Sequence, residues 1–145
     1  MRSAKIPLVV RSIRPHSVYQ NRVYTQLVEV SAQSKDFIVL DDSLLISDKH
    51  IGHELELELT TFSMDRNLEQ LGTQKGIEID QDMDAVKFLG KAIEVNIEKR
   101  KFLLDVGIGT ILCDGTDIEG RATKVNVGDY VVHNPRRIDV ESIYS

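Results

Sequence analysis

The stretch Glu54-Leu55-Glu56-Leu57-Glu58-Leu59 decides the fold class. Leucine and glutamate alternate in it with a period of two, which places all the leucines on one face of a strand and all the glutamates on the other. A helix would scatter both residue types around its surface. The stretch therefore predicts an antiparallel strand with one face in the core and one acidic face in water.

Further strands are expected on both sides of this one. Segments rich in valine, isoleucine, leucine and aromatic residues are typical of strands. They are Val23–Val30, Phe37–Leu40, Ala92–Ile97, Phe102–Leu104, Val125–Val132 and Ile138–Tyr144. Pro15 and Pro135 interrupt strand-like sequence and predict turns or bends. The chain is therefore expected to be mainly β.

Two short helices are expected in the middle of the chain. Ser63 is a suitable N-cap for a helix over Met64–Leu71, and a glycine follows its end. Asp80 is a suitable N-cap for a helix over Gln81–Leu89, which a glycine also ends. These two helices predict a short helical segment between two β-rich parts.

The order of the elements predicts one or two small barrels. Leu27–Thr61 reads as strand, hairpin, strand, loop and a turn at Gly52 that starts a further strand. This arrangement is similar to small OB-like and SH3-like barrels. We expect a single compact unit, 1–145, with three possible sub-units: a β-barrel half at 1–62, a helical connector at 63–90 and a second β half at 91–145.

The two β-rich parts resemble each other. Val28-Glu29-Val30 and Phe37 align with Ile93-Glu94-Val95 and Phe102 at a constant offset. An internal duplication explains this match, and so does the pattern that unrelated strands share. The sequence leaves both explanations open.

Composition places the chain among globular proteins. It has 145 residues, of which 41% are hydrophobic and 28% charged, and this balance argues against disorder. Its single cysteine excludes an intrachain disulfide and a multi-cysteine metal site. No apolar run approaches the length of a membrane helix, and Ile6–Val10 is too short for a signal peptide. We expect a cytoplasmic protein with no cofactor and no membrane partner.

Charge is distributed unevenly along the chain. The net charge is −5, which makes the protein acidic and disfavours a surface coated uniformly by nucleic acid. Residues 1–22 nevertheless carry only basic charges, at Arg2, Lys5, Arg11, Arg14 and Arg22. A local basic strip is sufficient to bind phosphate groups.

The basic N-terminal stretch also contains aromatic rings. Single-stranded nucleic acid binding uses both, since cations follow the phosphates and bases stack on the rings. The candidate residues are Arg11, Arg14, Tyr19, Arg22 and Tyr24, with Lys99, Arg100 and Lys101 as an extension from the second β half. Two alternatives remain open: another anion as ligand, or arginines that pair with acidic surfaces and contact water.

Other patterns resemble sites but lack essential parts. Asp80–Asp84 resembles the start of an EF-hand calcium loop, but Lys91 stands where that loop needs a bidentate glutamate. His50 and His53 have the spacing of a metal-binding pair without a third strong ligand. Cys113 lacks the surroundings of a catalytic cysteine and is typical of a small buried apolar residue. We assign no catalytic residue and no metal ligand.

Three functional classes follow from the sequence. We expect a non-catalytic β-barrel module whose partner is another protein or a second copy of the chain. The first alternative is an OB-like protein that binds single-stranded nucleic acid through the N-terminal stretch. The second is a small enzyme whose site is assembled from scattered histidine and aspartate residues.

Overall fold

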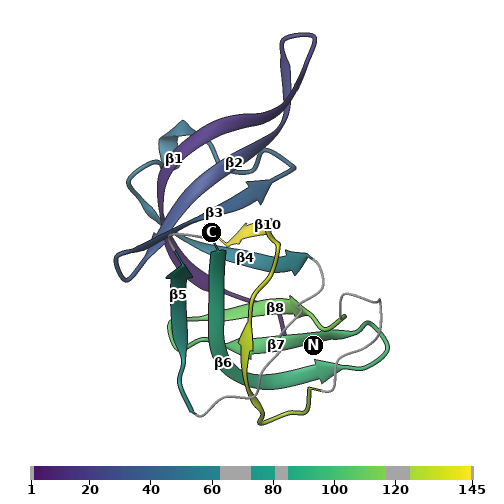
Figure 1. The fold of residues 1–145 in the computed structure, drawn as a ribbon. Coiled ribbons are helices and arrows are strands. Elements are labelled where there is room, and N and C mark those ends of the chain that lie inside the picture. Colours follow the sequence, from purple (N-terminus) through teal and green to yellow (C-terminus); the bar gives the residue numbers. More distant parts are fainter. Residues whose placement is uncertain (1, 63–72, 81–84, 117–124, 145) are drawn as a thin grey trace.

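The computed structural model describes residues 2–62, 73–80, 85–116 and 125–144, and these residues are mainly β (Figure 1). The strands are β1 (Ile6–Tyr19), β2 (Arg22–Ala32), β3 (Lys35–Asp41), β4 (Glu54–Phe62), β5 (Gly76–Asp80), β6 (Ala85–Asn96), β7 (Lys101–Asp105), β8 (Thr110–Asp114), β9 (Tyr130–His133) and β10 (Arg137–Tyr144). Within the described residues the only helical element is the 3-10 turn η1 (Asp48–His50). No helix in this part of the chain is long and apolar enough to cross a membrane.

Five strands close into a barrel, which forms the upper half of Figure 1. Their order is β1-β2-β3-β10-β4, and β4 returns to β1 through the pairs Ile6↔Leu57 and Leu8↔Leu55. The pair β3–β10 is parallel and the other pairs are antiparallel. The seam between β3 and β10 is short and has the register pair Asp139↔Leu40. The prediction of a mainly β fold with a small barrel is confirmed.

The structure confirms that the leucines and glutamates of strand β4 lie on opposite faces. Leu57 and Leu59 are both 0% exposed, while Glu54 and Glu56 are exposed. β4 pairs with β1 on one side and with β10 on the other. The leucines thus fill the barrel interior, and their burial is the hydrophobic contribution that holds these three strands together.

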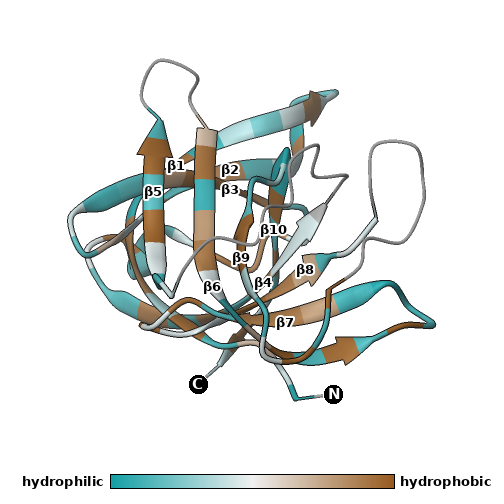
Figure 2. Cartoon of the chain, turned by 60° about the horizontal axis from the view of Figure 1, so that its bottom comes forward, coloured by the Kyte–Doolittle hydropathy of each residue, from teal (hydrophilic) through white to brown (hydrophobic). Residues whose placement is uncertain are grey.

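The chain segment between the barrel strands β4 and β10 forms the second half of the sheet, strands β5–β9. Strand β8 joins β4 through the parallel pair Thr60↔Leu112, and β7, β6 and β5 follow, with β9 beside β6. Hydrophobic segments lie on strands of both halves (Figure 2), and one hydrophobic cluster extends through both. Phe37 of the barrel and Phe88 of β6 meet edge to face, with ring centres 5.9 Å apart. The insertion therefore packs against the barrel instead of hanging from it.

The hairpins β2–β3 and β6–β7 share their local pairing. Val30 pairs with Phe37, and Val95 pairs with Phe102, so the offset between the two sequence segments is also the offset between their registers. Their neighbours differ, because β3 lies beside β10 whereas β7 lies beside β8. The match ends one residue further along, because Val28 pairs with Val39 whereas Leu104 pairs with Ala92 across a register shift, and both explanations of the resemblance stay open.

The helix predicted over Gln81–Leu89 is wrong for the residues that the structure describes. Residues 85–89 begin strand β6 and pair with β5, for example through Ile77↔Phe88. Apolar residues three apart suggested a helix, but Val86 and Phe88 also alternate around Lys87. Burial of Phe88 against Phe37 decides in favour of the strand, because tertiary packing overrides a weak local preference. Residues 81–84 and the predicted helix Met64–Leu71 lie outside the described residues.

Two other boundaries differ from the sequence prediction. β9 is shorter than Val125–Val132, because Asn126 and Asp129 form a turn in which the Asp129 amide donates to the Asn126 carbonyl at 3.0 Å. Pro15 lies inside β1 and not at its end, at a shift in register between Pro15 and Ser17. A bulge at this point fits a residue that has no N–H to donate.

Candidate binding groove and hairpin

A groove of about 360 Å³ lies at the waist of the molecule, between the barrel and the inserted half. Its walls come from the outer face of β2 and β3, from β5 and β6, and from the connection between β9 and β10. His16 of β1 completes the lining. The groove therefore collects residues from the N-terminal, middle and C-terminal parts of the chain.

The floor of the groove is apolar. Val28 and Val39 pair with each other and point into the barrel, where they are buried. Leu27 and Leu40, the next pair, point outward and line the groove together with Ile38. Antiparallel strands usually carry polar residues on their outer face. The outward apolar surface of β2 and β3 is therefore suited to contact with a ligand or with another protein surface.

The inserted half supplies the facing wall. Ile79 of β5 and Val86 of β6 are register partners, and both line the groove. They are partly buried and pack against the core cluster. The groove thus has apolar side chains on two facing walls, which is the usual composition of a ligand site.

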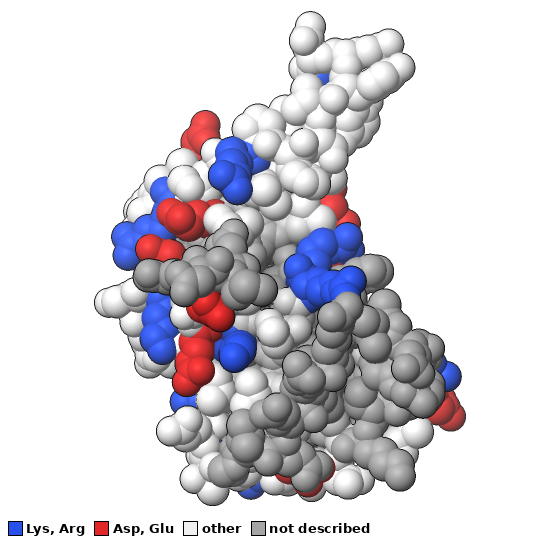
Figure 3. All heavy atoms as spheres, viewed as in Figure 1, with Lys and Arg blue, Asp and Glu red and all other residues white. Residues whose placement is uncertain are grey.

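Charged side chains stand at the rim. The guanidinium of Arg137 donates two hydrogen bonds to Asp139, from Nε to Oδ1 at 2.8 Å and from Nη2 to Oδ2 at 2.9 Å. Arg136 is exposed beside it, and Asp36 is the carboxylate among the described lining residues. Figure 3 shows Lys and Arg atoms gathered at the waist, on the side where β10 begins. The rim therefore combines two arginines with the carboxylates of Asp36 and Asp139.

Two predicted site residues, Arg11 and Arg14, lie on β1. Arg14 pairs with Leu27 on the neighbouring strand. Register partners share a face of a sheet, so Arg14 stands on the groove side of β1. Arg11 is exposed and lies at the register shift between Val10 and Ser12. The structure thus places at least Arg14 on the face that carries the groove.

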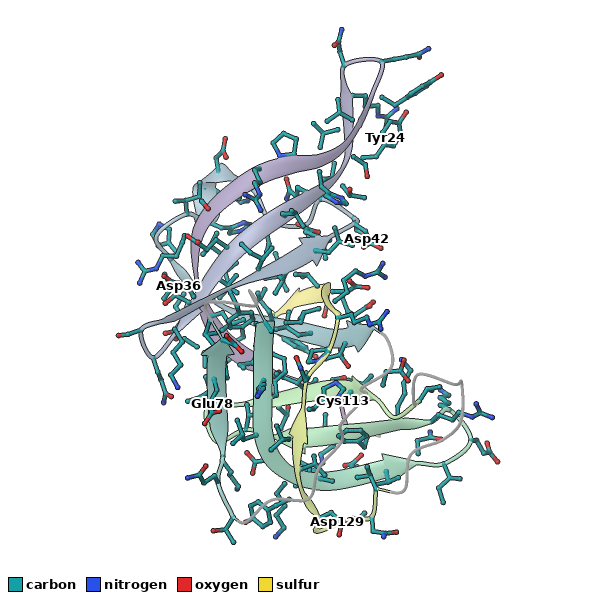
Figure 4. All side chains as sticks on the ribbon, in the orientation of Figure 1. Tyr24, Asp36, Asp42, Glu78, Cys113 and Asp129 are labelled. Atoms are coloured by element: carbon teal, nitrogen blue, oxygen red, sulfur yellow. The ribbon has the colours of Figure 1, made fainter. Side chains whose placement is uncertain are left out.

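Three predicted residues, Tyr19, Arg22 and Tyr24, form a cluster at the tip of the β1–β2 hairpin. Tyr19 pairs with Arg22 across the tight turn, and the guanidinium carbon of Arg22 lies 5.3 Å from the centre of the Tyr24 ring. Tyr19 and Tyr24 are 66% and 47% exposed. The hairpin projects beyond the barrel, with Tyr24 on the projecting part (Figure 4). We call these three residues the tip cluster.

The remaining predicted residues do not join this surface. Lys99, Arg100 and Lys101 lie at the turn between β6 and β7, whose tip is far from that of the β1–β2 hairpin in Figure 1. The Lys99 amide donates to Oδ1 of Asn96 at 3.0 Å, and the Arg100 carbonyl accepts from the Gly115 amide at 2.7 Å. The β1–β2 and β6–β7 hairpins thus present their basic residues at different ends of the molecule.

The patterns that resembled metal sites have structural roles or incompatible geometry. Nδ1 of His50 accepts a hydrogen bond from the Ser47 amide at 3.0 Å, next to η1. Asp80 pairs with Ala85 at the start of β6, so residues that an EF-hand requires in its loop belong to a strand. Among the described residues there is no group of three or more histidine, cysteine, aspartate or glutamate side chains placed to hold a metal ion. Cys113 is buried in β8.

Shifted pKa values occur away from the groove. Hydrogen bonds from Arg2 lower the pKa of Glu94. Burial alone would raise the pKa of Asp105, but hydrogen bonds from Lys75 and from the Gly107 amide, with the charges of nearby lysines, lower it overall. These two carboxyls belong to exposed ion pairs, with Arg2 and Lys75 respectively.

Sequence reasoning missed the groove itself. Its floor residues Leu27, Ile38 and Leu40 have the pattern of ordinary strand residues, and no motif marks Arg136 and Arg137. One signal was present in the sequence, since Phe37–Leu40 is apolar without alternation. An uninterrupted apolar run in an antiparallel strand indicates that both of its faces are covered.

Comparison with known proteins gives no family for this chain, because no family model, curated protein or solved structure matches it.

Proposed function

We propose that this protein is a non-catalytic binding module and that its ligand occupies the groove at the waist. The observation that carries the proposal is the outward apolar surface of β2 and β3, formed by Leu27, Ile38 and Leu40, with arginines at its rim. Apolar walls with a few charged groups at the edge are typical of ligand sites.

The barrel architecture supports this position for the ligand. The strand order, with β4 returning to β1, resembles OB-like barrels, whose ligands contact the second and third strands. In such barrels the loops between strands one and two, and between strands four and five, flank the ligand. Here the β1–β2 hairpin corresponds to the loop between strands one and two. The β5–β9 insertion corresponds to the loop between strands four and five, and residues of both line the groove.

The ligand that fits best is an anion with an apolar or planar body. The apolar walls favour such a body, and the guanidinium groups of Arg136 and Arg137 match phosphate or carboxylate oxygens in geometry and charge. Asp139 holds the Arg137 side chain in place through two hydrogen bonds. A fixed guanidinium loses less conformational freedom on binding than a mobile one.

The test is an NMR titration of the amide resonances with three anionic probes: inorganic polyphosphate, an oligothymidylate and a polyglutamate peptide. We expect at least one probe to shift the amides of Leu27, Ile38, Leu40 and Ile79. Arg136→Glu should weaken that binding about tenfold or more, because it replaces a charge-assisted contact with a repulsive one. Lys99→Glu, the same charge change at the distant hairpin, is the control.

Two results would contradict the proposal. One is that none of the three probes shifts the groove amides. The other is that a probe binds with the same affinity to the Arg136→Glu variant and to the unmodified protein. Thermal melting of both variants shows whether the fold is retained, so a loss of binding can be separated from a loss of structure.

A second candidate function is self-association, and a different surface favours it. Ile97 and Val127 are 83% and 66% exposed. Together with Ile93 and Val95 they line an open depression with a volume of about 470 Å³. Exposed apolar groups of this kind are typical of contacts between copies of a chain. Light scattering over a range of protein concentrations should then detect a dimer that Ile97→Lys abolishes. A monomer at every concentration would exclude this candidate.

A further inference from the structure

We propose that the ligand of the groove is a single-stranded nucleic acid that continues from the groove along the β1–β2 hairpin to the tip cluster. This inference rests on the proposed function and names its ligand class. It is carried by the juxtaposition of three features: an apolar groove with arginines at its rim, Arg14 on the groove side of β1, and exposed rings beside a guanidinium at the tip.

The tip cluster has the chemistry that bases and phosphates require. Tyr19 and Tyr24 expose much of their rings, and Arg22 pairs with the first and lies over the second. Bases of any sequence stack on aromatic faces, and a guanidinium beside the rings serves the phosphate between them. The alternative explanation, an arginine that merely covers a tyrosine, leaves the large exposed area of Tyr19 without a role.

The hairpin holds the tip cluster in a defined position. Gln20 and Asn21 form its turn with φ of 49° and 61°. A two-residue turn with both central residues in the left-handed region matches the twist of paired strands. β1 and β2 stay paired from Tyr19↔Arg22 to the barrel, with register shifts between Pro15 and Ser17 and between Ser17 and Val18. The rings are therefore presented on an ordered arm, which lowers the entropic cost of binding.

Arg14 connects the tip cluster with the groove. The strand rise places Arg14 roughly 16 Å from Tyr19, and Arg14 stands beside Leu27 at the edge of the groove. A single strand that contacts the tip, Arg14 and Arg136 would cover a few nucleotides. Barrels that bind single strands contact roughly 4–16 nucleotides each. The path from the tip cluster to Arg136 is compatible with the lower end of that range.

Other ligand classes explain only part of this surface. An acidic peptide would use the arginines but leave the exposed rings unused. An anionic membrane would accept the tyrosines and Val18 at the projecting tip. The groove would stay unoccupied, because its lining strands β5 and β6 lie away from that tip in Figure 1. Nucleic acid is the class that uses the groove, the cations and the rings together. The acidic charge elsewhere, for example at Glu54 and Glu56, restricts a polyanion to this surface.

The experiment measures fluorescence anisotropy of a labelled oligothymidylate of about 15 nucleotides, at about 50 and 200 mM salt. Inorganic polyphosphate, which has phosphates but no bases, and vesicles containing phosphatidylserine are the comparison probes. The variants are Tyr19→Ala with Tyr24→Ala, Arg11→Glu with Arg14→Glu, and Arg136→Glu. Lys99→Glu with Arg100→Glu is the matched control, since it reverses two charges at the other hairpin.

We expect the oligonucleotide to bind and to weaken steeply with salt. Removing both tyrosines should lower its affinity about tenfold or more and leave the affinity for polyphosphate unchanged. The charge reversals at Arg11 with Arg14 and at Arg136 should weaken both ligands, and the control should weaken neither. Because both tyrosines are largely exposed, the melting temperature should stay the same.

Each contrary outcome has a distinct meaning. If polyphosphate binds as well as the oligonucleotide and the tyrosine variant behaves like the unmodified protein, the nucleic-acid inference is wrong and the anion-binding groove remains. If the vesicles bind through the tyrosines while the oligonucleotide does not bind, the tip is a membrane contact and the inference is again wrong. If no probe binds, the proposed function fails together with the inference.

Discussion

Replacing Leu57 tests the packing of the barrel. Its side chain is 0% exposed and lies in β4 between Ile6 of β1 and Ile143 of β10. Leu57→Ala removes buried carbon atoms and leaves a cavity, which costs about 3 kcal/mol. A chain of this length has a free energy of unfolding of roughly 7–20 kcal/mol. The alanine variant should therefore fold, with a melting temperature lower by about 6–12 °C.

Leu57→Asp is the more severe change at the same position. It buries a carboxyl group where the neighbouring strands offer apolar side chains, and an unpaired buried charge costs far more than a cavity. We expect this variant to be unfolded at room temperature. The assay is circular dichroism during heating, with Glu56→Gln as the control, because an exposed neighbour should change the free energy of unfolding by less than about 0.5 kcal/mol. An aspartate variant that melts within a few degrees of the unmodified protein would refute the burial of Leu57 and the register of β4.

Three further predictions concern other parts of the fold. Gly109→Ala should lower the free energy of unfolding by about 1–3 kcal/mol in chemical denaturation, because its Cβ would lie 2.5 Å from the Lys5 carbonyl oxygen; unchanged stability would argue against this close approach of the β7–β8 turn to the start of β1. Lys75→Met should raise the pKa of Asp105 toward its ordinary value in an NMR titration, since the lysine donates to this carboxylate at 2.8 Å. The ion pair stabilises the fold above the ordinary pKa of the carboxyl, and this stabilisation is lost as the pH falls through the lowered value; a pKa of Asp105 that does not move would show that Lys75 does not act on it. Added calcium should leave the melting temperature unchanged, because residues 85–91 are in a strand and Lys91 repels the ion; a rise of several degrees would contradict this reading.

The elements that the sequence predicted well are those in which two signals agree. In β4 the alternation of leucine and glutamate and the preference for a strand point the same way, and the structure confirms both. In Gln81–Leu89 the spacing of apolar residues suggested a helix, while Val86 and Phe88 also fitted a strand. For the described residues, the pairing with strand β5 and the contact between Phe37 and Phe88 decide in favour of the strand. Both interactions form only in the folded protein, so the spacing of residues within the segment does not reveal them.

The candidate site was less accessible to sequence reasoning than the fold. The hairpin residues were recognisable, because charge and rings are interleaved in a short segment. The groove was not, because outward-facing Leu27 and Leu40 look like core residues until the register of β2 and β3 is known. Arg136 joins them only because β10 returns beside β3 after the whole β5–β9 insertion. Such long-range pairings leave no local signal in a single sequence.

The most direct test of the central claim is an amide-resolved NMR titration with an oligothymidylate. We predict shifts along β2 and β3 at the groove and at the tip of the β1–β2 hairpin, with the resonances of Lys99, Arg100 and Lys101 unmoved. Shifts confined to the β6–β7 turn, or no shift at a salt concentration of about 50 mM, would contradict the account.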